Sequence, residues 1–170
     1  NYKKTRSAKL LTNVLILFMT LFCLGFNSFA TEKHSDWLIK TFTKIDNLNT
    51  KDPALALELA QKTLSEQQGN LSDTDKVVLL SKMAQHHYFL GHLAKSKTVI
   101  ERASKLKPDY KSEAGIFLLM IHGAVIDEMG SSEKAMTLYL QAEHNAKETE
   151  NSALQAESYS YIANSYAMRQ

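Results

Sequence analysis

The segment IFLLMIHGAVIDEMGSSEKAMTLYLQA, residues 116–142, decides how the rest of the chain is interpreted. Its first half is strongly apolar and ends at Gly130, and its second half, from about Ser131, carries apolar residues at helical intervals. Small residues are spaced through both halves: Gly123, Gly130, Ala135 and Ala142. The segment therefore predicts a pair of helices joined by a glycine turn.

The first thirty residues differ in composition from the rest. Residues 1–9 contain four basic side chains and no acidic one, residues 10–26 are largely apolar, and residues 27–30 end in Ser-Phe-Ala. A basic start, an apolar middle and small residues at the exit are typical of a secretory signal peptide, so we expect cleavage after Ala30. An uncleaved anchor helix is the alternative, although the apolar run is short for a span of about 20 residues.

Export would change the charge of the protein. The 170 residues include 20 basic and 18 acidic ones, so removing the four basic leader residues leaves 16 basic residues and a net charge of −2. The single cysteine, Cys23, would leave with the leader, so residues 31–170 offer no disulfide and no thiolate metal site. A thiol-free domain suits an oxidising compartment, and a nearly neutral one gives no indication of nucleic-acid binding. We expect an exported, periplasmic bacterial protein.

Helical periodicity beyond residue 30 predicts an all-α fold. Asp52 followed by Pro53 is typical of a helix start, and Ser72 with Asp75 three residues later is a capping pattern. Gly91 and Gly130 are expected to end helices, because glycine readily adopts the backbone of a helix C-terminus. The predicted helices cover residues 35–48, 53 to at least 64, 73–90, 93–106, 110–129, 131–147 and 151 to the end.

Apolar and small positions recur through these helices at an interval of 39–40 residues. In the first helix of each pair the columns are Leu80, Leu119, Tyr159 and Ala84, Gly123, Ala163. In the second helix they are Ala56, Ser96, Ala135; Ala60, Ile100, Tyr139; and Thr63, Ala103, Ala142. Several columns in one register predict a helix-pair repeat in residues 31–170, with units starting near residues 37, 77, 116 and 156 and the last unit incomplete. Helices approach closely only where side chains are small, which assigns these residues to repeat packing: Ala84, Gly91, Ala103, Gly123, Gly130, Ala135, Ala142 and Ala163.

The pattern resembles the longer-period variants of the tetratricopeptide repeat family. Residues 80–108 contain an aliphatic residue, a small residue, a turn glycine, then small, bulky and small residues before a proline: Leu80, Ala84, Gly91, Ser96, Ile100, Ala103 and Pro108. Residues 119–142 match again without the final proline, whereas residues 37–64 match only in their second helix. The resemblance covers essentially residues 31–170 and implies a right-handed α-solenoid, but it says little about function.

The resemblance also implies a concave groove lined by the first helix of each pair. By register, the groove residues are Ser81, Gln85, Tyr88, Phe89, Met120, Asp127, Ser160 and Asn164. Their aromatic, amide, hydroxyl and carboxylate groups suit an extended peptide or a small ligand. The alternative is that apolar members such as Phe89 and Met120 pack between neighbouring helix pairs.

The titratable residues form no catalytic pattern. His86 and His87 are adjacent and therefore point about 100° apart on a helix, and no two histidines show the i, i+4 spacing of a helical metal site. His122 falls in a column of apolar residues, which favours packing. Asp127 and Glu128 are neighbours, whose side chains diverge on a helix rather than converging as acid–base catalysis needs. We expect no catalytic residue, no metal and no cofactor in this segment.

The function expected from these patterns is a non-catalytic, exported module that binds a protein or peptide, with membrane contact only through the leader or a downstream helix. The last predicted helix keeps the repeat register but has no partner helix before residue 170, which favours the N-terminal part of a longer protein. Exported repeats of this kind resemble the sensory region of membrane-bound bacterial diguanylate cyclases (GGDEF proteins) or histidine kinases, and a periplasmic assembly scaffold is a third possibility. An apolar run of about 20 residues and a catalytic motif beyond residue 170 would favour the sensor; a polar capping helix and a stop codon would exclude it.

Overall fold

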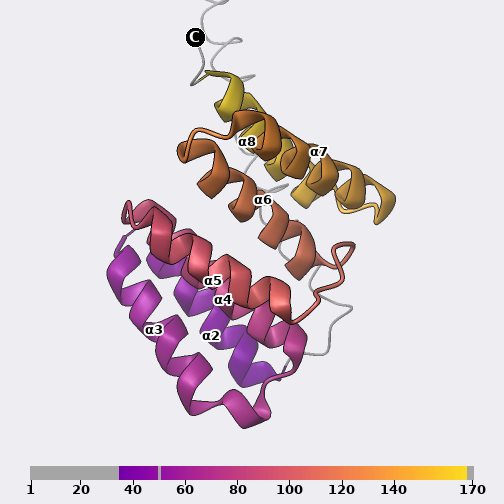
Figure 1. Ribbon diagram of the computed structural model, residues 1–170. Helices are drawn as coiled ribbons and strands as arrows, with labels where there is room; N and C mark the ends of the chain where they lie inside the picture. The colour runs from indigo at the N-terminus through magenta and orange to yellow at the C-terminus, as the bar shows by residue number, and fades with distance from the viewer. Residues whose placement is uncertain (1–34, 50, 168–170) are drawn as a thin grey trace, which may run out of the picture. The chain divides into compact units, whose positions relative to one another are not determined.

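The computed structural model describes residues 35–49 and 51–167, and the prediction of an all-α fold is confirmed there. The α-helices in chain order are α2 (Asp36–Asn49), α3 (Pro53–Glu66), α4 (Asp73–Phe89), α5 (Leu93–Lys105), α6 (Glu113–Glu128), α7 (Ser132–Glu148) and α8 (Ser152–Ala167), with a short 3₁₀ helix η2 (Gln68–Asn70) (Figure 1). All belong to the compact unit His34–Gln170. The predicted leader, residues 1–30, lies outside the described residues.

Local side chains start these helices where the sequence indicates. The Asp52 carboxylate accepts a hydrogen bond from the Leu55 amide at 3.0 Å, and a proline opens α3. At the start of α4, Ser72 and Asp75 form a capping box, in which each side chain accepts a hydrogen bond from the other's backbone amide. Both motifs occupy amide groups that a helix N-terminus leaves without intrahelical partners. The predicted start of α6 at residue 110 is wrong by three residues.

The period seen in the sequence is also present in the helix positions. Helices α4, α6 and α8 begin at residues 73, 113 and 152, and helices α3, α5 and α7 begin at residues 53, 93 and 132. Gly91 and Gly130 end the turns after α4 and α6 with φ angles of +72° and +86°, a backbone region that favours glycine. Each helix packs on its neighbours in the chain, and α4, α6 and α8 also pack on one another in succession.

The small-residue columns of the second helices are buried throughout. Ala56, Ser96 and Ala135 are fully buried, as are Ala103 and Ala142. The first-helix columns hold in α4 and α6, where Ala84 and Gly123 are buried, but not in α8. There Ala163 and Tyr159 are exposed, because no described helix covers that side of α8. The assignment of Ala163 to repeat packing therefore stays a prediction.

Gly123 marks a close contact between α6 and α7. A Cβ atom placed on it would lie 2.4 Å from Cε1 of Tyr139 on α7, which is far inside van der Waals distance. Absence of a side chain lets the Tyr139 ring cross α6 and stack on Tyr161 of α8, with ring centroids 5.6 Å apart. Within the described residues, no helix combines the length and the apolarity needed to cross a membrane.

Candidate functional site

A hollow with a volume of about 300 Å³ lies where α4 and α6 end and α8 passes them. Its lining residues come from four helices: Tyr88, Phe89, Ala124, Asp127, Glu128, Tyr139, Ser160, Tyr161, Asn164 and Ser165. We call this site the inner hollow. Five of the eight groove residues expected from register lie together in it: Tyr88, Phe89, Asp127, Ser160 and Asn164.

The other three expected groove residues do not line the inner hollow. Ser81 and Met120 are fully buried, and Gln85 is 8% exposed. The Met120 thioether accepts a hydrogen bond from the Ser158 hydroxyl at 3.3 Å, so it contacts α8 from within the core. Buried side chains cannot meet a ligand without moving. The inner side of α4 and α6 is thus closed over these three positions and open only near the helix ends.

Two polar links close that inner side. In the first, Lys82 of α4 pairs with Asp46 of α2, and its Nζ lies 5.9 Å from the ring centroid of Phe42 and 5.8 Å from that of Phe117. Glu157 of α8 interacts electrostatically with the same lysine, while burial raises the pKa of its carboxyl group. One cation therefore joins α2, α4 and α8 between two aromatic rings.

The second link lies about one helical turn further along. The Asn49 side chain of α2 donates a hydrogen bond to the Gln85 side chain of α4 at 3.2 Å. Gln85 in turn hydrogen-bonds the Tyr161 hydroxyl of α8, and burial raises the pKa of that tyrosine. Gln85 is thus a connector between helices, which explains its burial.

Two tyrosines of the inner hollow, Tyr139 and Tyr161, are not among the groove residues expected from register. Tyr139 lies on a second helix, α7, whereas the repeat resemblance assigns the groove to first helices only. The signal that could have found it is the pair Gly123 and Tyr139, because a glycine opposite a large ring indicates where that ring crosses the neighbouring helix. Tyr161 follows the expected Ser160 and points about 100° away from it on α8, so the register that selected Ser160 passed over Tyr161.

The electrostatic character of the inner hollow is negative. Among the residues that the structure describes, its lining contains two carboxylates, Asp127 and Glu128, and no lysine, arginine or histidine. One oxygen of Asp127 accepts a hydrogen bond from the Ser132 hydroxyl at 2.5 Å, which fixes the carboxylate at the turn between α6 and α7. Burial raises the pKa of Tyr88, and Glu128 and Asp127 raise it further. The two acids of α6 therefore act across the hollow on α4.

The histidines take structural positions. Both ring nitrogens of His86 are buried without a hydrogen-bond partner, and its pKa falls to about 4, because burial and then the nearby Lys82 disfavour the charged ring. His87 lies 5.9 Å from the exposed His92, ring centroid to ring centroid. His122 is half-buried, and burial lowers its pKa. Across residues 35–49 and 51–167, no three histidine, cysteine, aspartate or glutamate side chains gather as a metal site requires.

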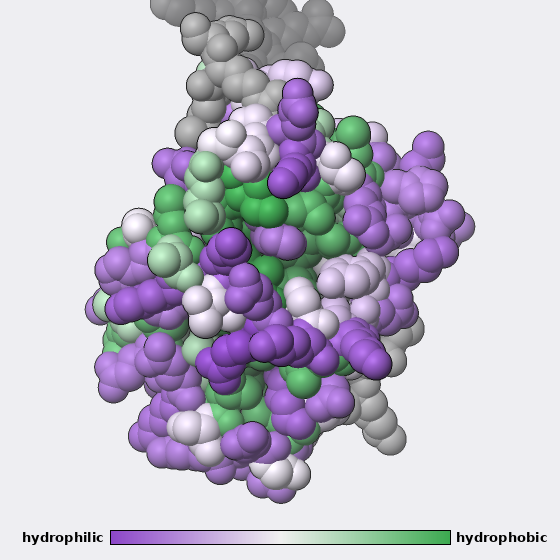
Figure 2. Space-filling model, in the orientation of Figure 1, coloured by the Kyte–Doolittle hydropathy of each residue, from purple (hydrophilic) through white to green (hydrophobic). Residues whose placement is uncertain are grey.

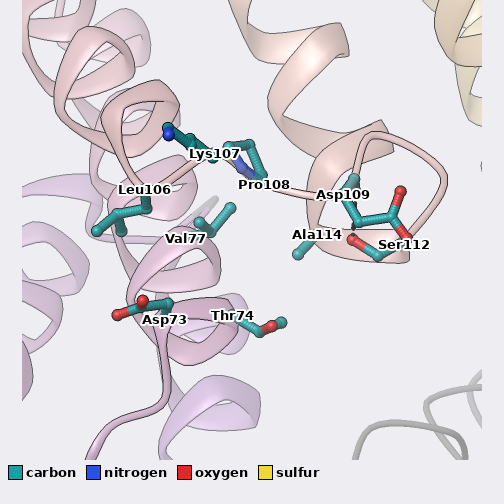
Figure 3. Close-up of a pocket in the computed structure, with 9 residues that line it drawn as sticks. All are labelled: Asp73, Thr74, Val77, Leu106, Lys107, Pro108, Asp109, Ser112 and Ala114. Atoms are coloured by element: carbon teal, nitrogen blue, oxygen red, sulfur yellow. Dashed lines mark hydrogen bonds between the residues drawn. The ribbon is translucent and has the colours of Figure 1, made fainter.

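The described unit also has an apolar surface region and a second, smaller hollow. Figure 2 shows apolar residues gathered over the middle of the displayed face, with hydrophilic residues around them. The smaller hollow, of about 90 Å³, lies beneath the loop between α5 and α6, where Pro108 and Asp109 face Val77 and Ala114 (Figure 3). Its loop is held by a 2.7 Å hydrogen bond from the Ser112 hydroxyl to the Asp109 carbonyl. We interpret this hollow as a packing gap under a turn.

The fold and the inner hollow thus define an all-α protein of successive helix pairs with one acidic, aromatic-lined hollow. No family model matches the chain, and neither the curated proteins nor the solved structures include a significant match.

Proposed function

We propose that this chain is a non-catalytic binding module that holds a short segment of a partner protein in the inner hollow. The observation that carries the proposal is that five of the eight residues selected by register line one hollow, and these five are of four chemical kinds. A volume of about 300 Å³ is at the lower end of the range for ligand sites. Phe89, which is 50% exposed, and Met129, which is 49% exposed, add apolar surface of the kind that protein segments cover.

We propose further that the helix pairs form a right-handed α-solenoid of the tetratricopeptide type. The supporting observations are the 39–40-residue spacing of helix starts and the buried columns of small residues in α3, α5 and α7. Such stacks commonly present a continuous inner surface to extended partners. In the proposed arrangement, the two polar links close the early part of that surface and direct binding to the ends of α4 and α6.

The test of binding uses a displayed library of random 12-residue peptides. Selection on the wild-type chain is expected to enrich related sequences, and the double variant Tyr88→Ala with Asp127→Asn is expected to lose them. The matched control removes an exposed aromatic residue and an exposed acid elsewhere, Trp37→Ala with Glu58→Gln. If the enriched peptides bind both double variants equally well at unchanged melting temperature, the inner hollow is not the site.

We also propose that the module works outside the cytoplasm, on the composition of residues 1–30. Sequencing the N-terminus of the protein from its native host tests this: a chain beginning at Thr31 supports export with cleavage, whereas one beginning at Asn1 or Tyr2 contradicts it. The sensory-region and scaffold alternatives remain predictions that the downstream reading frame decides.

A further inference from the structure

We propose that the inner hollow takes one arginine side chain of the partner segment, with the guanidinium at Asp127 and Glu128 and the aliphatic stem along the aromatic rings. This inference rests on the proposed binding function and names the chemistry of the group that is bound.

The charges of the residues that line the inner hollow favour a cation. Two carboxylates and no basic side chain line the inner hollow among the described residues, so the charges of the lining favour a cationic group over an anionic one. A guanidinium presents parallel N–H groups that match a carboxylate in a bidentate pair. Asp127 is held in place by the Ser132 hydroxyl, so little side-chain freedom is lost when it binds.

The helix ends add to the same field. Phe89 is the last residue of α4 and Glu128 the last of α6, and both line the inner hollow. A helix C-terminus carries a partial negative charge of about half an electron, which attracts cations within the last turn. Two such ends meet at this site. The raised pKa of Tyr88, for which the two acids are partly responsible, is what a negative potential at this place would cause.

The aromatic rings select the shape of the cation. Tyr88 and Phe89 of α4 have ring centroids 5.7 Å apart and tilted by 54°, and both rings are at least partly exposed, whereas Tyr139 is 2% exposed and stacks on Tyr161 inside the unit. A planar guanidinium stacks on such rings and is less strongly hydrated than an ammonium. These properties favour arginine over lysine.

The volume of the inner hollow limits how many side chains it can hold. A hollow of about 300 Å³ accepts one long side chain, while the segment that carries it stays on the surface beside Phe89 and Met129. Both apolar side chains are about half exposed and can contact that segment.

The experiment measures binding of a fluorescent nine-residue peptide of alanine and serine with one central arginine, by titration at low salt. Three matched peptides carry citrulline, lysine or glutamate instead. We expect the citrulline peptide to bind at least tenfold more weakly, because citrulline keeps the shape and removes the charge. Lysine should bind several-fold more weakly than arginine, and glutamate should not bind.

Matched variants test whether the arginine peptide binds at the inner hollow. Asp127→Asn with Glu128→Gln is expected to weaken arginine-peptide binding at least tenfold, and Glu128→Gln alone at least threefold without loss of folding, because Glu128 is exposed. Glu58→Gln with Glu66→Gln makes the same charge change on α3 and should leave binding unchanged. Equal loss in both double variants would overturn the site.

The outcomes separate this inference from the proposed function. If library-selected peptides bind at the hollow but citrulline replaces arginine without loss, the inference is overturned and the binding function stands. If methylguanidinium alone binds as tightly as the arginine peptide, the occupant is a small organic cation and a side chain is excluded. If neither selected peptides nor the arginine peptide bind, both proposals fail.

Discussion

At Gly123 the lack of a Cβ atom allows α6 and α7 to pack closely. A Cβ there would press on the Tyr139 ring, which is 2% exposed and stacked on Tyr161. Alanine gains about 1 kcal/mol of helix propensity over glycine, but overpacking a buried site costs typically about 1–3 kcal/mol. We expect Gly123→Ala to lower the free energy of unfolding in urea by about 1 kcal/mol and to weaken binding at the inner hollow.

Gly69 provides the control for that change. It lies in η2, where an added Cβ would have no atom within 4 Å. Gly69→Ala should therefore leave the urea midpoint unchanged or raise it slightly. Equal stability of the two variants would show that the Tyr139 ring can move aside at no cost.

His86 carries the pH dependence expected at the scale of one residue. Its pKa is about 4 in the folded chain, whereas an unfolded histidine titrates near 6.5. Above pH 6.5 both states are neutral and the residue contributes no pH dependence. Between about pH 6.5 and 4 only the unfolded chain takes up the proton, so stability falls as the pH falls, by up to about 3 kcal/mol.

The variant His86→Leu tests this linkage. We expect the difference in unfolding free energy between pH 7.5 and pH 4.5 to shrink by about 2 kcal/mol in the variant. At pH 7.5 the variant should be at least as stable as the wild type, since the ring nitrogens have no partners to lose. His144→Leu, at a largely exposed position, is the control. A pH dependence that is identical in wild type and His86→Leu would contradict the assignment.

Helix α4 is the element through which α2 and α8 are connected. Its residues Lys82 and Gln85 hold Asp46 and Asn49 of α2, and they also interact with side chains of α8. Burial raises the pKa of Glu157, and Lys82 opposes that shift. Lys82→Met removes the opposing charge while keeping an apolar stem beside Phe42 and Phe117. We therefore expect the pKa of Glu157 to rise further in this variant.

Carbon-detected NMR titration of the side-chain carboxyls measures the change directly. The control is Lys76→Met. Lys76 lies near the start of the same helix, α4, and pairs with Asp73 at 3.0 Å. That change should leave the Glu157 titration as in the wild type. If Lys82→Met lowers the pKa of Glu157 or leaves it fixed, the charge link between α4 and α8 is absent.

The elements also show how far sequence reasoning reaches. Caps and turn glycines are local signals, so α3 and α4 start where Asp52 and Ser72 predict. The start of α6 was expected too early, because Ser112 caps the helix after a turn in which its amide donates to the Asp109 carbonyl. The polar links could not be predicted, because each joins residues 36 positions apart that individually resemble solvated side chains. The burial of Ser81, Gln85 and Met120 could not be predicted either, because helix register shows which face of a helix they share but not which other helix covers that face.

At the scale of the whole described unit, stability should come from contacts between successive helices. Each helix packs on the next, and α6 also packs on α4 and α8. In stacks of this kind, loss of one interface loosens the adjoining unit more than distant ones. Helix α8 is the element to test, because several of its attachments are specific side-chain contacts, among them the Ser158–Met120 contact, the stacking of Tyr161 on Tyr139, and the hydrogen bonds of Gln155 and Tyr159 to Glu143.

Tyr161→Ala removes the ring that contacts both Tyr139 and Gln85. We expect a loss of about 2–3 kcal/mol, as for truncation of a largely buried aromatic side chain, concentrated in α8. Hydrogen exchange by mass spectrometry should show faster exchange in residues 152–167 and unchanged exchange in α3 and α5, because those helices keep the packing on their neighbours in the chain. Leu140→Ala, at a position on α7 that is 53% exposed, is the control and should alter neither region. Faster exchange spread evenly from α2 to α8 would mean that the helices unfold as one cooperative unit and would contradict a stack stabilised by neighbouring interfaces.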